Sequence, residues 1–150
     1  YGANTEKGRR NRIINGKIKT EKNMTFNINW DKNGVYIKFR GIVNSQDLID
    51  ANNYLISNAN FDTIKYQLFD FLDIEEFQIG KADMEIIGTM DKSQSDFKND
   101  MKIAIITNDD YVRKMTVHYD QFMAGSNWIT KVFSNVQTAR AWVLEKWNRI

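Results

Sequence analysis

The sequence of 150 residues contains no cysteine and no proline, and it has a single histidine. The lack of cysteine excludes disulfides, thiolate metal sites and cysteine nucleophiles, and it agrees with a reducing compartment, so we expect a cytoplasmic protein. No apolar run approaches the roughly 18 residues that span a bilayer, and the first residues lack the apolar segment of a signal peptide. Hydrophobic residues nevertheless make up 42% of the chain, which predicts a packed core.

Positive charge is concentrated at the start of the chain. Residues 1–23 hold seven of the 21 Lys and Arg and two of the 19 Asp and Glu, so this segment carries +5 and residues 24–150 carry −3. We therefore interpret 1–23 as a basic, flexible leader or tail and 24–150 as one mildly acidic domain. Because the basic excess lies outside the domain, it does not indicate nucleic-acid binding.

Strand and helix patterns alternate along residues 24–150. Two alternating runs flank an Asn33-Gly34 turn, which we expect to need a positive φ, and Gly41 closes the second run. The expected strands are 26–30, 35–39, 66–71, 102–107 and 128–133. The expected apolar helix faces are Leu48, Ala51, Leu55, Ile56 and Ala59; Ala82, Ile86, Met90 and Phe97; Val112, Met115, Tyr119 and Phe122; and Ala139, Trp142 and Val143.

Helix starts are also marked in the sequence. Asn44 or Ser45 suits the first helix and Asn108 the third, while Ser134 begins an S-x-x-Q capping box for the fourth. The element order is then β-β-α-β-α-β-α-β-α. It predicts an α/β domain with a mixed, mostly parallel five-stranded sheet and four helices.

Four strings from Trp30 to Val143 carry a family resemblance through their order and spacing. They are YIKFRGIVNSQDLIDANNYL, KYQLFDFLDIEEF, KIAIITNDDYVRKM and ITKVFSNVQTARAWV. The chain thereby resembles the SpoIIAA-like proteins, relatives of the STAS domains that act as anti-sigma factor antagonists and as modules on anion transporters. The resemblance implies a STAS-like fold, and some of these proteins look like small-ligand or membrane-associated binding modules.

The regulatory members of that family carry a phosphorylated serine at the start of the helix after the central strand. The corresponding stretch here runs from Asp70 to Gly80, and Ile79 or Gly80 fills the acceptor position. A phosphoryl switch needs an acceptor oxygen, and a phosphate would also be repelled by the carboxylates of this stretch. We therefore expect no phosphoserine switch.

Catalytic patterns are weak. His118 has no nucleophile elbow to pair with, and we interpret it as a surface or packing residue. No phosphate-loop motif occurs, and no metal or other cofactor is expected. Asp70, Asp73 and Lys131 could converge as in a receiver that accepts a phosphoryl group on an Mg²⁺ site, and this stays as a distant alternative.

The default binding site is the edge where parallel strands end, because ligands of open α/β sheets usually bind there. We expect an acidic loop at 73–80 and an exposed Phe77 at this edge. The candidate residues are Asp73, Glu75, Glu76, Phe77, Asn108 and Asp109.

The expected function is that of a non-catalytic binding or regulatory module that contacts an unidentified protein partner. The alternative is a small lipophilic ligand, held if the loop opens an apolar gap beneath it, or a membrane surface. Peripheral membrane contact and homo-oligomerisation stay open.

Overall fold

The computed structural model describes the backbone of residues 4–6, 12–14 and 17–19 and the whole of residues 25–98 and 100–146. The strands are β1 (Asn4–Glu6), β2 (Arg12–Ile14), β3 (Lys17–Lys19), β4 (Phe26–Trp30), β5 (Gly34–Asn44), β6 (Tyr66–Gln78), β7 (Met101–Ile106) and β8 (Trp128–Phe133). The helices are α1 (Ser45–Ser57), the short 3₁₀ helix η2 (Ala59–Asp62), α2 (Lys81–Ser95), α3 (Asp110–Phe122) and α4 (Val136–Leu144). The predicted α/β class, with five strands and four helices after residue 24, is confirmed.

The main sheet has the strand order β1-β4-β5-β6-β7-β8. The β1–β4 and β4–β5 pairs are antiparallel, and the pairs from β5 to β8 are parallel, as the alternation of strands and helices predicts. β1 adds a sixth strand that the sequence patterns did not suggest, and β2 and β3 form a separate antiparallel pair. Most of the predicted leader lies outside the described residues, and its character stays a prediction.

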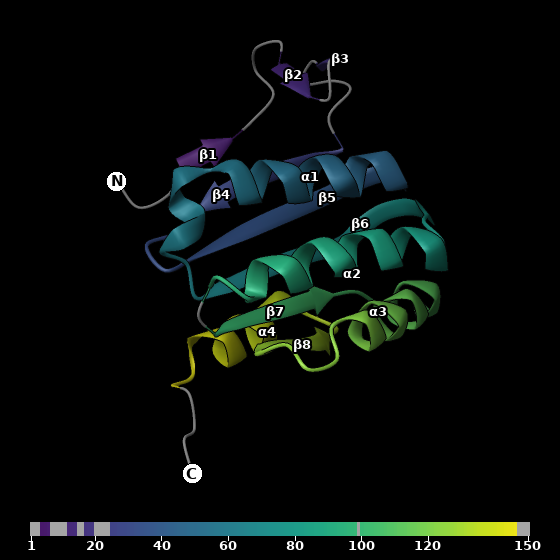
Figure 1. The fold of residues 1–150 in the computed structure, drawn as a ribbon. Coiled ribbons are helices and arrows are strands. Elements are labelled where there is room, and N and C mark those ends of the chain that lie inside the picture. Colours follow the sequence, from purple (N-terminus) through teal and green to yellow (C-terminus); the bar gives the residue numbers. More distant parts are fainter. Residues whose placement is uncertain (1–3, 7–11, 15–16, 20–24, 99, 147–150) are drawn as a thin grey trace.

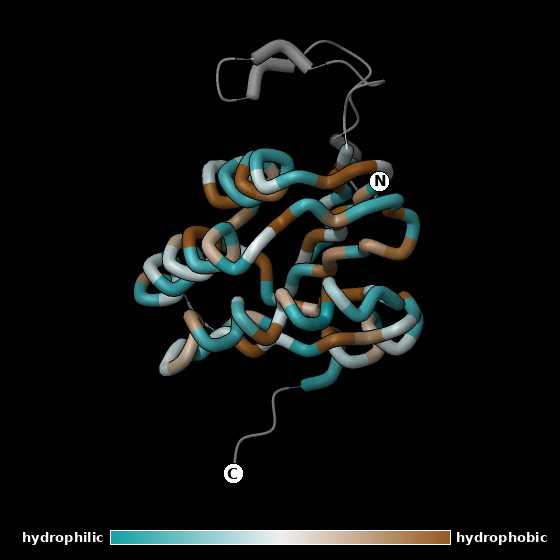
Figure 2. The backbone as a smooth tube through the Cα atoms, turned by 90° about the vertical axis from the view of Figure 1, so that its right-hand side faces the viewer, coloured by the Kyte–Doolittle hydropathy of each residue, from teal (hydrophilic) through white to brown (hydrophobic). Residues whose placement is uncertain are grey.

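Helices cover the sheet unequally. α1, α2 and α3 lie on one face and α4 on the other (Figure 1). The larger hydrophobic cluster lies under the three helices, and a smaller one, with Leu68 and Ile106 at its centre, lies under α4. In Figure 2 hydrophobic stretches follow the strands between these helical layers. The thicker layer of helices is therefore where internal space can form.

Gly34 has a different role from the one that the turn pattern suggests. Its φ is not positive, and it is the first residue of β5. A Cβ atom at Gly34 would overlap the ring of Tyr66 on the neighbouring strand β6. The glycine is thus required by close packing, and the prediction of a positive-φ turn residue is wrong.

β5 and β6 are longer than predicted. β5 continues to Asn44 past Gly41, which adopts a φ of 70° at a register shift, and β6 continues to Gln78. Pairing with β7 stops at Asp70, so the last part of β6 extends beyond the rest of the parallel sheet. The predicted acidic loop is wrong, because this segment is held as a strand by its pairing with β5.

The buried face of α2 also differs from the predicted one. Ile86 is 50% exposed, Phe97 is 89% exposed, and Ala82 is exposed as well. The residues that α2 buries are Met84, Ile87, Gly88, Asp91 and Ser95. Both sets have helical spacing, so periodicity did not decide between them, and the actual face includes a carboxyl group.

Helix starts were predicted to within one residue. Asn44 caps α1, one of the two predicted alternatives. The side chain of Asp109, rather than Asn108, caps α3, and Asn135, rather than Ser134, caps α4. Neighbouring Asn, Asp and Ser residues all have cap propensity, so the backbone geometry selects among them.

Candidate functional site

The predicted acidic residues lie on the extended end of β6. Asp73, Glu75 and Glu76 are exposed there. Lys38 of β5 lies 2.8 Å from an Asp73 oxygen, and this interaction lowers the pKa of Asp73. Glu76 is joined to Gln78 by a side-chain hydrogen bond. Two of the three carboxylates thus interact with neighbouring side chains of β5 and β6.

Phe77 is buried, with only 8% of its surface exposed, so the prediction of an exposed Phe77 is wrong. Its ring packs edge-on against Phe71 at a centroid distance of 5.3 Å and against Tyr111 at 6.3 Å. The Tyr111 hydroxyl donates to the Ile79 carbonyl at 2.7 Å. These contacts join the end of β6 to the start of α3, and they hold the Phe77 side chain in the interior of the protein.

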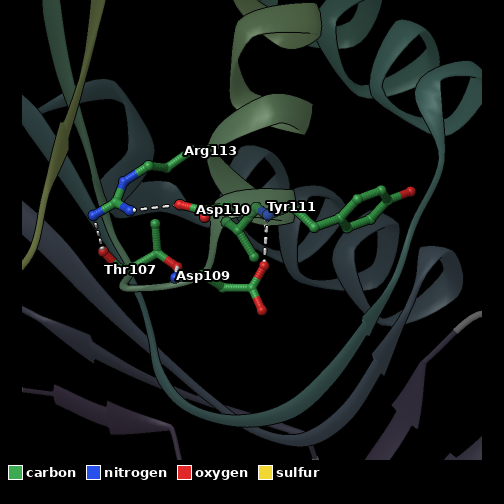
Figure 3. A network of polar contacts seen from close by, with 6 residues as sticks. Thr107, Asp109, Asp110, Tyr111 and Arg113 are labelled. Carbon is green, nitrogen blue, oxygen red and sulfur yellow. Dashed lines mark hydrogen bonds and ion pairs between the residues drawn. The ribbon is translucent and has the colours of Figure 1, made fainter.

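Asn108 and Asp109 lie in the turn from β7 to α3, and both are exposed. Asp109 Oδ1 accepts from the backbone N–H groups of Tyr111 and Val112 at 2.8 and 3.0 Å. Figure 3 shows this turn, with Arg113 reaching the Thr107 carbonyl and the Tyr111 ring pointing away from it. Asp109 therefore has a structural role as a helix cap.

Asp70 and Lys131 do not form the pair that a receiver would need. Asp70 is fully buried and accepts from the Tyr36 hydroxyl, from Lys38 Nζ at 3.2 Å and from the Leu72 N–H at 2.9 Å. Lys131 instead places its Nζ over the rings of Phe133 and Trp142, 5.7 and 5.9 Å from their centroids. The cation near Asp70 and Asp73 is Lys38, which β5 contributes from within the sheet.

A partly open cavity of about 40 Å³ lies between the sheet and the layer of α1, α2 and α3. Its wall is mainly aliphatic and aromatic, with few polar groups. The lining residues are Leu48, Asn52, Phe69, Phe71, Phe77, Met84, Ile87, Asp91, Ile103, Ile105, Val112, Met115, Thr116 and Tyr119. We call this space the helix-layer cavity. Of the predicted site residues, only Phe77 belongs to it.

One carboxyl group lines the helix-layer cavity. Asp91 of α2 is 5% exposed; its Oδ1 accepts from Asn52 Nδ2 of α1 at 3.0 Å, and its Oδ2 accepts from the Tyr119 hydroxyl of α3 at 2.6 Å. Three helices thus converge on one carboxyl. The Thr116 hydroxyl donates to the Val112 carbonyl at 2.8 Å and is satisfied within α3.

Burial dominates the electrostatics of this cluster. Removal from water raises the pKa of Asp91 to about 6, although the hydrogen bonds from Tyr119 and Asn52 act in the opposite direction. Burial, together with the neighbouring Asp91 charge, raises the pKa of Tyr119 well above its ordinary value. Tyr119 is therefore a neutral donor at physiological pH, and Asp91 is mostly ionised at pH 7.

Sequence reasoning missed Asp91 and Asn52 because polar residues on helices are ordinarily assigned to the solvated face. A signal was nevertheless present. Asp91 follows Met84 and Ile87 by seven and four residues, so it continues an apolar stripe with a carboxyl. His118, by contrast, is half-buried with its Nδ1 3.4 Å from Gln121 Oε1, as a surface or packing residue would be.

Within residues 25–98 and 100–146, no group of three or more His, Cys, Asp or Glu residues is arranged to hold a metal ion. None of the described helices is both long and apolar enough to cross a bilayer.

Fold and site together define a mixed-sheet α/β protein with a mostly apolar cavity in its thicker helical layer. Comparison with known proteins adds no relative: no family model, curated protein or solved structure matches the chain.

Proposed function

We propose that this protein is a non-catalytic binding module that holds a small apolar molecule in the helix-layer cavity. The observation that carries the proposal is the cavity itself. Its wall is built from three helices and two strands, and apolar side chains make up most of it. Small-molecule sites have this character: concave, mainly apolar, with a few polar groups that fix orientation.

The methionine side chains of the wall support ligand entry. Met84 and Met115 lie on facing helices, and methionine is unbranched and repacks easily around a guest. The space at rest is about 40 Å³, enough for only a few water molecules, so a larger ligand must displace these side chains.

The lining supports binding over catalysis. Its two hydroxyl groups, on Thr116 and Tyr119, donate to internal acceptors, the Val112 carbonyl and the Asp91 carboxylate. Tyr119 stays neutral because its pKa is raised. The proposal therefore keeps the expectation of a module without enzymatic activity.

We also propose that the fold is SpoIIAA-like and related to the STAS domains. The order of strands and helices and the four sequence strings from Trp30 to Val143 support this kinship. The helix after the central strand begins without a hydroxyl acceptor, at Gly80 and Lys81, which supports a function independent of serine phosphorylation.

Native mass spectrometry tests the ligand proposal. The purified protein should carry a small bound mass, or gain one when incubated with a short-chain alcohol. Val112→Phe fills the cavity from α3 and should abolish that mass. Val117→Phe makes the same change at a position on α3 that is 58% exposed, and it should retain the mass. Equal spectra for both variants would contradict the proposal.

A second candidate function, contact with a basic protein partner, is favoured by the end of β6. Glu75 and Glu76 are exposed where β6 is no longer paired with β7. A basic surface of a partner could contact these two carboxylates without any change in the core.

Charge reversal tests this second candidate. Glu75→Lys/Glu76→Lys should abolish recovery of an identified partner in pull-down experiments, whereas Glu85→Lys/Glu145→Lys, which reverses two exposed charges elsewhere, should leave it intact. If both double variants recover the same partner equally, the acidic end of β6 is not the contact surface.

A further inference from the structure

We propose that the helix-layer cavity selects a small apolar molecule with a protonated amine, and that the Asp91 carboxylate is the counter-ion of that amine. The inference rests on the proposed ligand-binding function and deepens it by naming the chemical class of the ligand.

Asp91 lies where a bound ligand would meet it. It is buried in the wall of the cavity, and both of its oxygens have their positions fixed by hydrogen bonds from α1 and α3. A carboxylate can accept about four hydrogen bonds, two at each oxygen, and Asn52 and Tyr119 supply one each. Acceptor capacity therefore remains at both oxygens for a ligand donor.

Asp91 has no counter-charge among the described residues. No ion pair among the described residues includes Asp91, and no Lys, Arg or His lines the cavity in that part of the chain. Both of its hydrogen-bond donors are neutral. An ionised carboxylate in an apolar wall is costly unless a cation accompanies it. A bound ammonium group would supply that cation at the one place where the protein lacks it.

The rest of the cavity wall suits a short apolar tail. Beyond Asp91, Asn52 and Tyr119, the cavity offers mainly the apolar side chains of β6, β7 and α3. A short aliphatic or aromatic tail would be buried there, and an anionic head group would be repelled by the Asp91 carboxylate. The wall therefore favours a cationic head over a neutral one and a neutral head over an anionic one.

Three ligands with the same chain and different heads test the inference: n-butylamine, 1-butanol and butyrate. Calorimetric titration of the whole protein at pH 8, where both Asp91 and the amine are charged, should give at least a tenfold tighter dissociation constant for the amine than for the alcohol. Butyrate should bind most weakly. Equal affinities for amine and alcohol, or a preference for butyrate, would overturn the amine inference and leave the ligand-binding function intact. No saturable binding of any of the three would instead contradict the proposed function.

Asp91→Asn tests whether the amine preference comes from this carboxylate or from the surface charge of the protein. The amide keeps a shape that can pair with Asn52 and Tyr119, and it should reduce the amine preference to less than threefold. Glu85→Gln removes an exposed carboxylate from the same helix and should leave the preference unchanged. Retention of the preference in Asp91→Asn would overturn the inference.

A measurement on the wild-type protein keeps the test valid if Asp91→Asn fails to fold. The groups that face Asp91 are the neutral Asn52 from α1, the neutral phenol Tyr119 from α3 and apolar side chains from β6 and β7. Lowering the pH from 8 to 4.5 should therefore protonate Asp91 and remove the amine preference. The NMR chemical shift of the Asp91 carboxyl carbon should follow this protonation. A preference that persists at pH 4.5 would contradict the assignment.

Discussion

At the scale of single residues, the most informative feature is a carboxyl group where a hydrophobic side chain would be expected. Asp91 continues the buried stripe of α2, yet it is satisfied only by neutral donors. The fold thus tolerates a buried charge beside a cavity. Burying such a charge lowers the stability of the folded state.

The pH dependence of stability follows from this group. The folded-state pKa of Asp91, about 6, lies above the value of 3.8 that it has in the unfolded chain. The folded protein therefore binds the extra proton, so the cost of burying the charge is fully present above about pH 6 and is relieved as the pH falls from 6 towards 4.

We predict that Asp91→Asn is more stable than the wild type at pH 7.5 and loses this advantage at pH 4.5. Urea unfolding at the two pH values measures the difference between the two proteins, and the subtraction removes the contributions of carboxylates that both share, such as Asp73. A difference that does not change with pH would contradict the assigned burial of the charge.

Gly34 gives a second prediction at this scale. Gly34→Ala should lower the free energy of unfolding by about 1–3 kcal/mol, because the new methyl group overlaps the Tyr66 ring. Gly80→Ala is a suitable comparison, since its new methyl group would lie no closer than 3.9 Å to another side chain, and it should cost less. Chemical denaturation of the two variants decides the matter; equal losses would contradict the packing role of Gly34.

At the scale of elements, the contact between α2 and α3 sets the shape of the cavity. Gly88 lets the two helices approach, because a Cβ atom there would lie 2.8 Å from Phe122 Cβ. From sequence alone Gly88 looks like a weakness in a helix, with a cost of up to about 1 kcal/mol relative to alanine. The structure gives it a packing role instead.

We therefore predict that Gly88→Ala destabilises the protein by about 1–3 kcal/mol despite the higher helix propensity of alanine. Thr89→Ala, at the exposed neighbouring position, should have a small effect. Thermal unfolding of both variants measures this. A stabilised Gly88→Ala protein would show that α2 and α3 are not closely packed at this position.

The success of sequence reasoning also differs between elements. The strand at 128–133 and the buried strand before α3 were predicted almost to the residue, because their apolar runs end at turn and cap residues. The end of β6 was missed, since its acidic side chains resemble a loop and only pairing with β5 makes it a strand. The face of α2 was wrong because two sets of residues share helical spacing, and tertiary contacts select between them.

At the scale of the whole molecule, the class of fold was predictable and the cavity was not. Alternating strands and helices determine a mostly parallel sheet, but a cavity depends on how three helices pack against it at once. Phe77 illustrates the limit, because the sequence predicts an exposed side chain and the structure buries it in the wall of the helix-layer cavity. The apolar gap suggested by the sequence was to open beneath a loop, and residues up to Gln78 form a strand instead.

The central claim is that the helix-layer cavity admits a small apolar molecule. The methionine methyl groups provide a direct test, because Met84 and Met115 line the cavity and Met90, a half-buried residue of α2, does not. Titration of ¹³C-methyl-methionine protein with 1-butanol should shift the Met84 and Met115 signals along one saturable curve and leave Met90 nearly unchanged. Unmoved Met84 and Met115 signals, or a uniform linear drift of all the methyl signals, would contradict the claim.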